Sequence, residues 1–371
     1  MSLTSHRPRA LTAALLAVAA PLLAVAGPGA LADPAQAAVR SVSATGGTTT
    51  IGPRTTGAQL TAALSALRPG DTLLLAPGTY RTGLVVPNPP AMAVRTRMHV
   101  GRPDAPITVR AADPARRPLI LGELKLWGAS HWVLDGLRVQ AVDRGRDALF
   151  MGGGTGWTVR RSEFTGARQT GAYSNVSIAS DIYGSGAPRG FTFTGNCVHD
   201  AAQTTRGTTD HNVYVSFAGT PGSGGVISRN VIFNHPRGVG IKLGNGGLAR
   251  ARGPWGVHVT HNTIVNGGRQ VFLHADVGDN TVSRNILAGS TQTFASLRRT
   301  TSSYFHQVIG RGNVFAGNYA SGASMFSYGG GVALRGDNAV RSDPGFTSGG
   351  CGGYRPSNPA AAGYGRYAAA R

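Results

Sequence analysis

Lysine is rare in this chain, and one of its two lysines lies in a short run that alternates apolar and polar residues. Lys125 and Lys242 stand among 36 basic residues, all the others being arginine. A lysine amine removes a proton from a substrate when its pKa lies near the working pH. Tyr214 and His274 occur in similar alternating runs, and either side chain can donate a proton. We therefore predict a proton-transfer site formed by Lys242, Tyr214 and His274.

Arginine-rich connections near these runs suit an acidic ligand. Arg250 and Arg252 lie in the connection 244–256, and Arg269 precedes the run that contains His274. An arginine holds a carboxylate through two parallel hydrogen bonds. These arginines are also expected to lower the pKa of Lys242 by like-charge repulsion. The predicted substrate-binding residues are Arg269, Arg250, Arg252, His211, Asn212 and Trp255.

The three runs can be laid on one another as stacked strands. If Val213, Ile241 and Val271 face an interior, the residue after each of them points outward. Tyr214 and Lys242 are two of those residues, and His274 falls in the next outward column. Stacked strands lie about 4.8 Å apart, so these side chains are expected to share one patch.

Asparagine recurs at one position of an aligned repeat. Unequal repeat lengths with a constant local pattern are typical of a solenoid whose coils carry insertions. Stacked asparagine side chains hydrogen-bond along the axis and satisfy turn backbone, so we predict a structural role for them. The aligned positions are Leu137, Ser162, Asn196, Asn230, Asn262, Asn285 and Asn313, at steps of 25, 34, 34, 32, 23 and 28 residues.

Composition indicates an all-β chain with a single short helix near its start. The 41% of hydrophobic residues argues against disorder, and the 55 glycines punctuate strand-like runs. A helix is predicted from Thr55 or Thr56 as its cap, with Leu60, Leu64 and Leu67 on one face. Such a helix would cover the open end of a strand stack.

The segment 60–80, LTAALSALRPGDTLLLAPGTY, resembles the N-terminal cap and first coil of secreted right-handed parallel β-helix proteins. That superfamily includes pectate lyases, alginate lyases and chondroitinase B. The resemblance covers residues 55–365. It implies an all-β, single-stranded right-handed parallel β-helix with a short N-terminal capping helix. It further implies cleavage of a uronate-containing polysaccharide by β-elimination.

Chondroitinase B and the alginate lyases similar to it use a lysine base and an arginine on neighbouring coils. The sequence around Lys242 resembles the lysine position. The matching strand of the next coil carries Phe272 and His274 instead of arginine, and Arg269 lies earlier in it. The resemblance therefore supports the lysine more closely than the arginine.

These enzymes also hold calcium in an acidic cluster. The whole chain has 16 acidic residues, and Asp276 with Asp279 is the closest local pair. The sequence predicts no metal ligands and no definite cofactor, with calcium left open.

A hydrolytic mechanism needs paired carboxylates. Polygalacturonases of this superfamily carry adjacent aspartates on consecutive strands. The corresponding residues here are Asp147, Asn175, Asn212, Gly240 and Gln270, which supply one acid among neutral residues. A lyase is therefore favoured over a glycoside hydrolase.

The formal net charge of +20 favours a polyanionic partner. No nucleic-acid-binding module is present, so the predicted partner is acidic polysaccharide, with no nucleic acid partner and a monomeric protein. Two functions remain: a polysaccharide lyase, and a non-catalytic β-helix that binds anionic glycans or a cell-surface polymer. The arginine bias of the whole chain is an alternative source of the charge.

Residues 1–37 have the organisation of a signal peptide. Basic residues precede an apolar stretch over 10–26, and small-residue cleavage sites follow at 30–32 and 35–37. We expect a secreted, extracellular protein with no membrane association after cleavage. The expected divisions are a signal at 1–37, a linker or first edge at 38–55, the β-helix at 55–365 and a tail at 366–371.

Cys197 and Cys351 are the two cysteines of the chain. In an exported protein they are expected to form one disulfide that fastens the C-terminal segment to the body. Two free thiols are the alternative.

Overall fold

The computed structural model describes most of the chain after residue 45. The described ranges are 46–85, 99–143, 145–167, 174–181, 186–201, 211–244, 253–274, 277–290, 295–298, 312–321, 326–328, 332–336 and 338–369. The predicted signal segment and both Arg250 and Arg252 lie outside them. In the described ranges, no helix has the length and apolar character needed to cross a membrane.

One sheet contains a strand from nearly every coil of the solenoid. Its strands pair in parallel and follow one another in sequence order, and among the described elements one helix and the strands of the other sheet lie between them. We call it sheet A. Its strands, in spatial order, are β1 (Thr48–Ile51), β2 (Thr72–Leu75), β4 (Ile107–Ala111), β6 (Trp132–Asp135), β9 (Thr158–Arg160), β12 (Arg189–Thr194), β15 (Gly224–Ser228), β17 (Val257–Thr260), β19 (Thr281–Ser283), β22 (Asn313–Ala316) and β25 (Val332–Arg335).

The second sheet, sheet B, is also parallel and bends around a corner. Its shorter half holds β7 (Arg138–Gln140), β10 (Glu163–Thr165), β13 (Cys197–His199), β20 (Ile286–Ser290), β23 (Tyr319–Ser321) and β26 (Ala339–Arg341). Its other half holds β8 (Leu149–Gly152), β11 (Ser174–Ala179), β14 (His211–Ser216), β21 (Ala295–Arg298) and β24 (Phe326–Tyr328). The strands β5 (Leu119–Trp127), β16 (Val231–Leu243) and β18 (Thr263–His274) run through both halves, and β3 (Thr79–Val85) pairs with β5.

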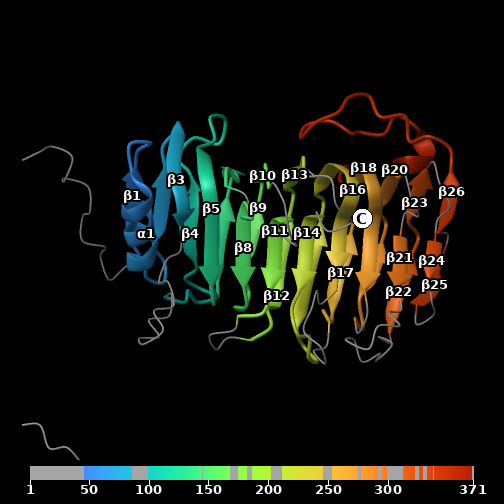
Figure 1. Cartoon of the computed structure of the whole chain (residues 1–371), viewed down its shortest axis with the longest axis horizontal. Coiled ribbons are helices and arrows are strands. Elements are labelled where there is room, and N and C mark those ends of the chain that lie inside the picture. Colours follow the sequence, from blue (N-terminus) through green and yellow to red (C-terminus); the bar gives the residue numbers. More distant parts are fainter. Residues whose placement is uncertain are drawn as a thin grey trace, which may run out of the picture. The chain divides into compact units, whose positions relative to one another are not determined.

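The chain therefore visits sheet A, the short half of sheet B and its other half in each coil, and then begins the next coil. The strands stack side by side from β1 to β26 (Figure 1). This is the right-handed parallel β-helix expected from the sequence. The first strand, β1, falls within the stretch 38–55 that was expected to be a linker or first edge.

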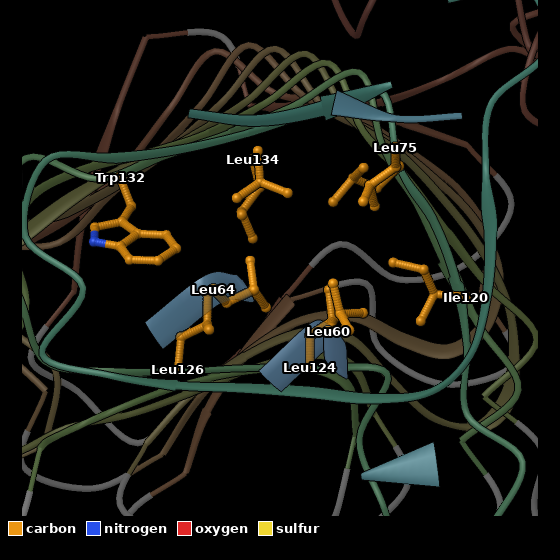
Figure 2. Close-up of a pocket in the computed structure, with 10 residues that line it drawn as sticks. Leu60, Leu64, Leu75, Ile120, Leu124, Leu126, Trp132 and Leu134 are labelled. Atoms are coloured by element: carbon orange, nitrogen blue, oxygen red, sulfur yellow. The ribbon is translucent and has the colours of Figure 1, made fainter. Parts of the chain in front are cut away.

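A capped helix closes the first coil. Helix α1 (Gly57–Ala66) begins after Thr56, whose hydroxyl accepts from Gln59 N at 3.2 Å, while Thr56 N donates to Gln59 Oε1 at 2.9 Å. Its buried Leu60 and Leu64 project among the apolar side chains of the first coils, including Leu134 (Figure 2). A void of about 10 Å³ remains there with an entirely apolar lining, which is the kind of cavity that stays dry. The predicted capping helix is confirmed.

A ladder of asparagine side chains runs through the corner between sheet A and the short half of sheet B. Each backbone N–H donates to the side-chain oxygen of the next coil, at distances of 2.8–3.1 Å. The side chains from Asn196 to Asn285 are wholly buried, so these bonds satisfy donors that water cannot reach. The ladder runs through Ser162, Asn196, Asn230, Asn262, Asn285, Asn318 and Asn338.

The structural role predicted for this asparagine series is confirmed, but the assignment of Asn313 was wrong. Asn285 N donates to Asn318, whereas Asn313 accepts from Asn280 N in a second ladder, at the start of the sheet A strands. Both asparagines follow a glycine, and the long insertion before residue 312 gave the sequence pattern no means of choosing between them.

Removing one ladder side chain should destabilise the whole coil stack. Asn262→Ala deletes the acceptor for Asn230 N and leaves a buried donor unpaired, which costs about 1–3 kcal/mol. The outward-facing Thr158→Ala is the control and should change the free energy of unfolding by less than about 0.5 kcal/mol. Urea denaturation of both variants checks this. Equal midpoints for the two variants would contradict a supporting role for the ladder.

The C-terminal segment packs on the outward face of the short half of sheet B. The disulfide between Cys197 and Cys351 is present, which confirms the predicted pairing and excludes the free-thiol alternative. The ring of Tyr354 lies 5.3 Å from that of Phe233 and 5.3 Å from that of Phe346. A small second apolar cluster therefore lies outside the coil, under this segment.

Loss of this disulfide should lower stability without changing the fold of the coils. It closes a loop of 154 residues, and native disulfides of this kind contribute about 2–5 kcal/mol. The variant Cys197→Ser/Cys351→Ser should unfold at lower urea concentration than the oxidised protein and at the same concentration as the reduced one. A variant as stable as the oxidised protein would show that the apolar contacts alone fasten the segment.

Candidate functional site

The strands that carry the predicted proton-transfer residues stack in the expected register. Tyr214 of β14 pairs with Lys242 of β16, which pairs with Phe272 of β18. The residues before them are Val213, Ile241 and Val271, all completely buried in the core of the coil. Alternation therefore points Tyr214, Lys242 and Phe272 away from that core, as predicted.

Lys242 lies against an aromatic ring. Its Nζ is 4.7 Å from the centroid of the Tyr214 ring, a cation–π distance. Burial lowers the pKa of Lys242 from 10.5 to about 8, because desolvation penalises the charged amine. The expected cause was like-charge repulsion from neighbouring arginines, of which Arg250 and Arg252 lie outside the described residues. The lowered pKa is thus present, but for a different physical reason.

Tyr214 is held between Lys242 and a buried histidine. The His211 ring meets the Tyr214 ring edge-on, with centroids 5.4 Å apart and planes at 63°. Tyr214 is 7% exposed and His211 is 1% exposed. His211 therefore contacts Tyr214 and lies too deep to serve as the substrate contact predicted for it.

Four of the remaining predicted residues lie at the end of β18, before β17 or outside the described part of the chain. His274 ends β18 and pairs with Arg298, in the outward column next to that of Lys242, while its side chain lies outside the described part of the chain. Trp255 lies just before β17 (Val257–Thr260), where its ring rests on Gly278. Arg250 and Arg252 are in a connection that is not described.

Arg269 lies on the same strand as Phe272, on the coil next to Lys242. Its backbone pairs with Val239 of β16, and its Cζ is 5.1 Å from the centroid of the Phe272 ring. Arginine both stacks on aromatic faces and binds carboxylates through its planar fork of donors. This placement is compatible with the predicted carboxylate contact.

Asn212 has a structural role in place of the predicted substrate contact. It is wholly buried, accepts from Asn175 Nδ2 at 2.8 Å and donates to Phe233 O at 2.9 Å. His235 lies 3.2 Å from Asn212 and 2.9 Å from Gln270 Oε1. Burial lowers the pKa of His235 to about 4, so the ring is neutral at pH 7. These groups form a polar network inside the corner of sheet B.

The sequence alignment placed Asp147 one residue out of register. Ala148 N donates to Asn175 O, so Ala148 is the neighbour of Asn175, and Asp147 instead accepts from Ser174 N at 2.8 Å. Burial raises the pKa of Asp147 to about 7. The row of Asn175, Asn212, Gly240 and Gln270 therefore contains no acid, which further disfavours paired-carboxylate hydrolysis.

Sequence reasoning missed that both lysines of the chain lie in one outward column. Lys125 of β5 pairs with Phe150, and the column continues through Ser177 and Tyr214 to Lys242. Lys125 also faces an aromatic ring, with Nζ 4.6 Å from the Phe150 centroid. A signal existed, because Leu-Lys-Leu at 124–126 matches Ile-Lys-Leu at 241–243.

The described side chains around Lys242 do not suit calcium. Its column neighbours are an aromatic residue on each side, and the adjacent row is neutral, whereas calcium prefers several carboxylate or carbonyl oxygens. Among the described residues, Cys197, His199 and Cys351 bring metal-binding atoms together, but the two sulfurs form the disulfide.

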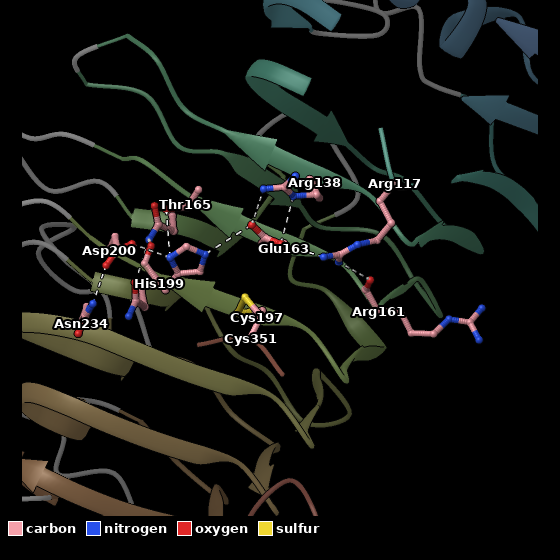
Figure 3. A network of polar contacts seen from close by, with 12 residues as sticks. Arg117, Arg138, Arg161, Glu163, Thr165, Cys197, His199, Asp200, Asn234 and Cys351 are labelled. Atoms are coloured by element: carbon pink, nitrogen blue, oxygen red, sulfur yellow. Dashed lines mark hydrogen bonds and ion pairs between the residues drawn. A yellow bond between two sulfur atoms is a disulfide. The ribbon is translucent and has the colours of Figure 1, made fainter. Parts of the chain in front are cut away.

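A separate ionic cluster surrounds Glu163 on the short half of sheet B (Figure 3). Arg117 and Arg138 pair with Glu163 at 2.9 and 3.2 Å, and His199 Nε2 lies 3.7 Å away. These partners, His199 first, lower the pKa of Glu163 to about 2. The cluster links adjacent coils beside the disulfide and does not contact Lys242.

Comparison with known proteins identifies the fold. No protein-family model and no curated protein sequence matches the chain. An alginate lyase of family PL6, solved with a trisaccharide, is 17% identical with a TM-score of 0.50 over 73% of this chain and 54% of that enzyme. The chain thus spans about half the length of that alginate lyase.

The pectate lyase Pel9A is 15% identical, with a TM-score of 0.44 over 82% of this chain and 84% of the enzyme. The A-module of the Azotobacter vinelandii mannuronan C-5 epimerase AlgE4 is 12% identical, with a TM-score of 0.38 over 73% of this chain and 87% of the module. The parallel β-helix fold expected from the resemblance is confirmed.

The lowered pKa of Lys242 can be measured directly because the chain has one other lysine. Reductive ¹³C-methylation gives one side-chain NMR signal for each, and the signal missing in Lys242→Arg identifies Lys242. It should titrate near pH 8. In the unfolded state Lys242 keeps its proton up to about pH 10.5, whereas in the folded state it loses the proton near pH 8. The free energy of unfolding should therefore rise with pH between about 8 and 10.5. The Lys242→Met variant should lose that rise. A midpoint above pH 10 would contradict desolvation of the amine.

Proposed function

We propose that the protein is a polysaccharide lyase that cleaves a uronate-containing polymer by β-elimination. The supporting observation is a lysine with a pKa of about 8 whose amine lies 4.7 Å from the Tyr214 ring. A base must be neutral near working pH to remove a carbon-bound proton, and burial supplies that condition for Lys242. The shared fold with an alginate lyase and the net charge of +20 are compatible with an acidic polymer.

In the proposed reaction, Lys242 Nζ takes the proton from C5 of the uronate. The electron pair of that C–H bond forms the C4–C5 double bond, and the bond from C4 to the glycosidic oxygen breaks. The Tyr214 hydroxyl donates its proton to the leaving oxygen. Proton exchange with solvent then restores the neutral amine and the neutral phenol, so no atom or electron is left over.

Arg269 is the proposed carboxylate ligand. Removal of the C5 proton places negative charge on the uronate carboxylate, and a guanidinium stabilises it through charge-assisted hydrogen bonds. Its stacking on Phe272 holds the guanidinium on the coil beside Lys242. His274, in the next outward column, is proposed as an alternative proton donor.

A non-catalytic β-helix that binds anionic glycans is the second proposal. The 7% exposure of Tyr214 and of Phe272 supports it, because aromatic residues so covered offer little contact area to a polymer. The two proposals differ in a single observable, the appearance of an unsaturated uronate.

We also propose that the protein is exported. The predicted signal segment and the disulfide between Cys197 and Cys351 support an oxidising destination.

Substitution of Lys242 tests the lyase. Wild-type protein is incubated with polygalacturonate, alginate and chondroitin, and ultraviolet absorbance follows the unsaturated product. Lys242→Ala should reduce the rate on the preferred polymer by about 10²–10⁴-fold. The control is Lys125→Ala. It removes a lysine from the same column, together with a similar contact to an aromatic ring. The rate of this variant should stay within about twofold of the wild-type rate.

The pH profile gives a second test of the same group. Activity requires neutral Lys242, so the rate should rise with pH through about 8 and then level off. Equal losses in the two lysine variants would remove Lys242 as the base. Retention on these polymers with no absorbance change from any of them would establish the binding protein.

A further inference from the structure

One turn of each coil repeatedly adopts a backbone conformation that favours glycine, yet basic residues occupy it. This turn joins sheet A to the asparagine ladder. Gly136, Gly195 and Gly317 fill it in three coils, with φ of 70°, 65° and 56°. In other coils it holds Arg161, Arg229, His261 and Arg284, with φ of 52–54°. Non-glycine residues are uncommon in this region, so the basic side chains occupy this turn despite its conformational preference for glycine.

These four basic residues form one row along the coil axis, which we call the arginine ridge. Each backbone N–H donates to the residue that precedes the same turn in the next coil. Arg229 N donates to Thr260 O, His261 N to Ser283 O and Arg284 N to Ala316 O, at 3.2–3.3 Å. Successive members therefore lie about 4.8 Å apart, except where Gly195 separates Arg161 from Arg229.

The positive charge of the ridge is poorly balanced. Within the described part of the chain, no ion pair includes Arg229 or Arg284, although Arg229 Nη1 donates a hydrogen bond to Ala368 O at 2.8 Å. Arg161 shares Asp135 with Arg160. The pKa of His261 is lowered by burial and then by the charges of Arg229 and Arg284. The side chain of Arg161 is 67% exposed and points away from the Glu163 cluster (Figure 3).

A column of hydroxyl groups runs beside the ridge, at the last residue of four sheet A strands. Thr194 Oγ1 and Ser228 Oγ are 3.0 Å apart, and Ser283 Oγ donates to Thr260 Oγ1 at 3.1 Å. Thr260 Oγ1 also lies 2.9 Å from Nδ1 of His261. The strip thus combines basic side chains with hydroxyl groups and contains no phenylalanine, tyrosine or tryptophan.

We propose that the arginine ridge and its hydroxyl column bind a linear anionic polysaccharide that lies along the coil axis, apart from the Lys242 site. Carboxylate or sulfate groups pair with the arginines, and sugar hydroxyls hydrogen-bond to the threonine and serine column. Single-stranded nucleic acid is disfavoured because it is bound on stacked aromatic platforms, which this strip lacks. The two sites share no residue, so the ridge functions as a holding surface whether or not Lys242 is catalytic.

Binding to immobilised alginate at 50 mM salt tests the ridge. All variants carry Lys242→Ala so that the polymer is not consumed. Arg229→Gln/Arg284→Gln should weaken binding by about tenfold, from two lost ion pairs. The control Arg54→Gln/Arg81→Gln removes the same charge from two exposed arginines near α1 and should weaken binding less than about twofold. Unchanged melting temperatures show that the ridge pair folds.

Two further measurements keep this inference separate from the lyase. When Lys242 is intact, Arg229→Gln/Arg284→Gln should release unsaturated product from a uronate trisaccharide at the wild-type rate. The binding assay does not depend on this activity, because all of its variants carry Lys242→Ala. The NMR-measured pKa of His261 should rise when alginate binds, because carboxylates stabilise the imidazolium. Equal weakening by both arginine pairs, or no rise in the His261 pKa, would overturn the proposal. Tighter, ridge-dependent binding of duplex DNA than of alginate would replace it with a nucleic acid site.

Discussion

Hydrogen bonding along the coil axis is the constraint on which the rest of this structure depends. Every coil must return to the same place, about 4.8 Å farther on, for the parallel ladders to continue. The corner before the short half of sheet B is fixed by the buried amide ladder from Asn196 to Asn338. Residues of different coils, such as Tyr214 and Lys242, become neighbours because that corner repeats.

The same regularity explains how a lysine acquires an unusual pKa without a charged partner. An outward residue on a sheet is flanked by the matching residues of the coils before and after it. For Lys242 these are Tyr214 and Phe272, each 7% exposed. Two large rings exclude water from the amine while the cation–π contact only partly compensates for the lost hydration. The stacking order thus contributes to the desolvation that lowers this pKa.

Local alternation predicted the parts of the site that depend on neighbouring coils. The pairing of Tyr214, Lys242 and Phe272 follows from matching short patterns, and so do the ladder positions from Ser162 to Asn285. Burial at a corner was not predictable, because the alternation that made Asn212 an outward residue fails where sheet B bends inward. Asn313 was misplaced since a long insertion precedes it. The shared column of Lys125 and Lys242 was missed because several coils separate the two residues, and the strand register of each of those coils is needed to align them.

The disulfide also determines what the loops of this protein are free to do. Because Cys197 is joined to Cys351, the coils between them belong to a covalent ring closed across 154 residues of chain. A break in any connection inside that ring leaves both new ends attached to the same body. The connections after β14, β16 and β18 all lie between the two cysteines in the sequence, so each of them can be cleaved without releasing the C-terminal coils.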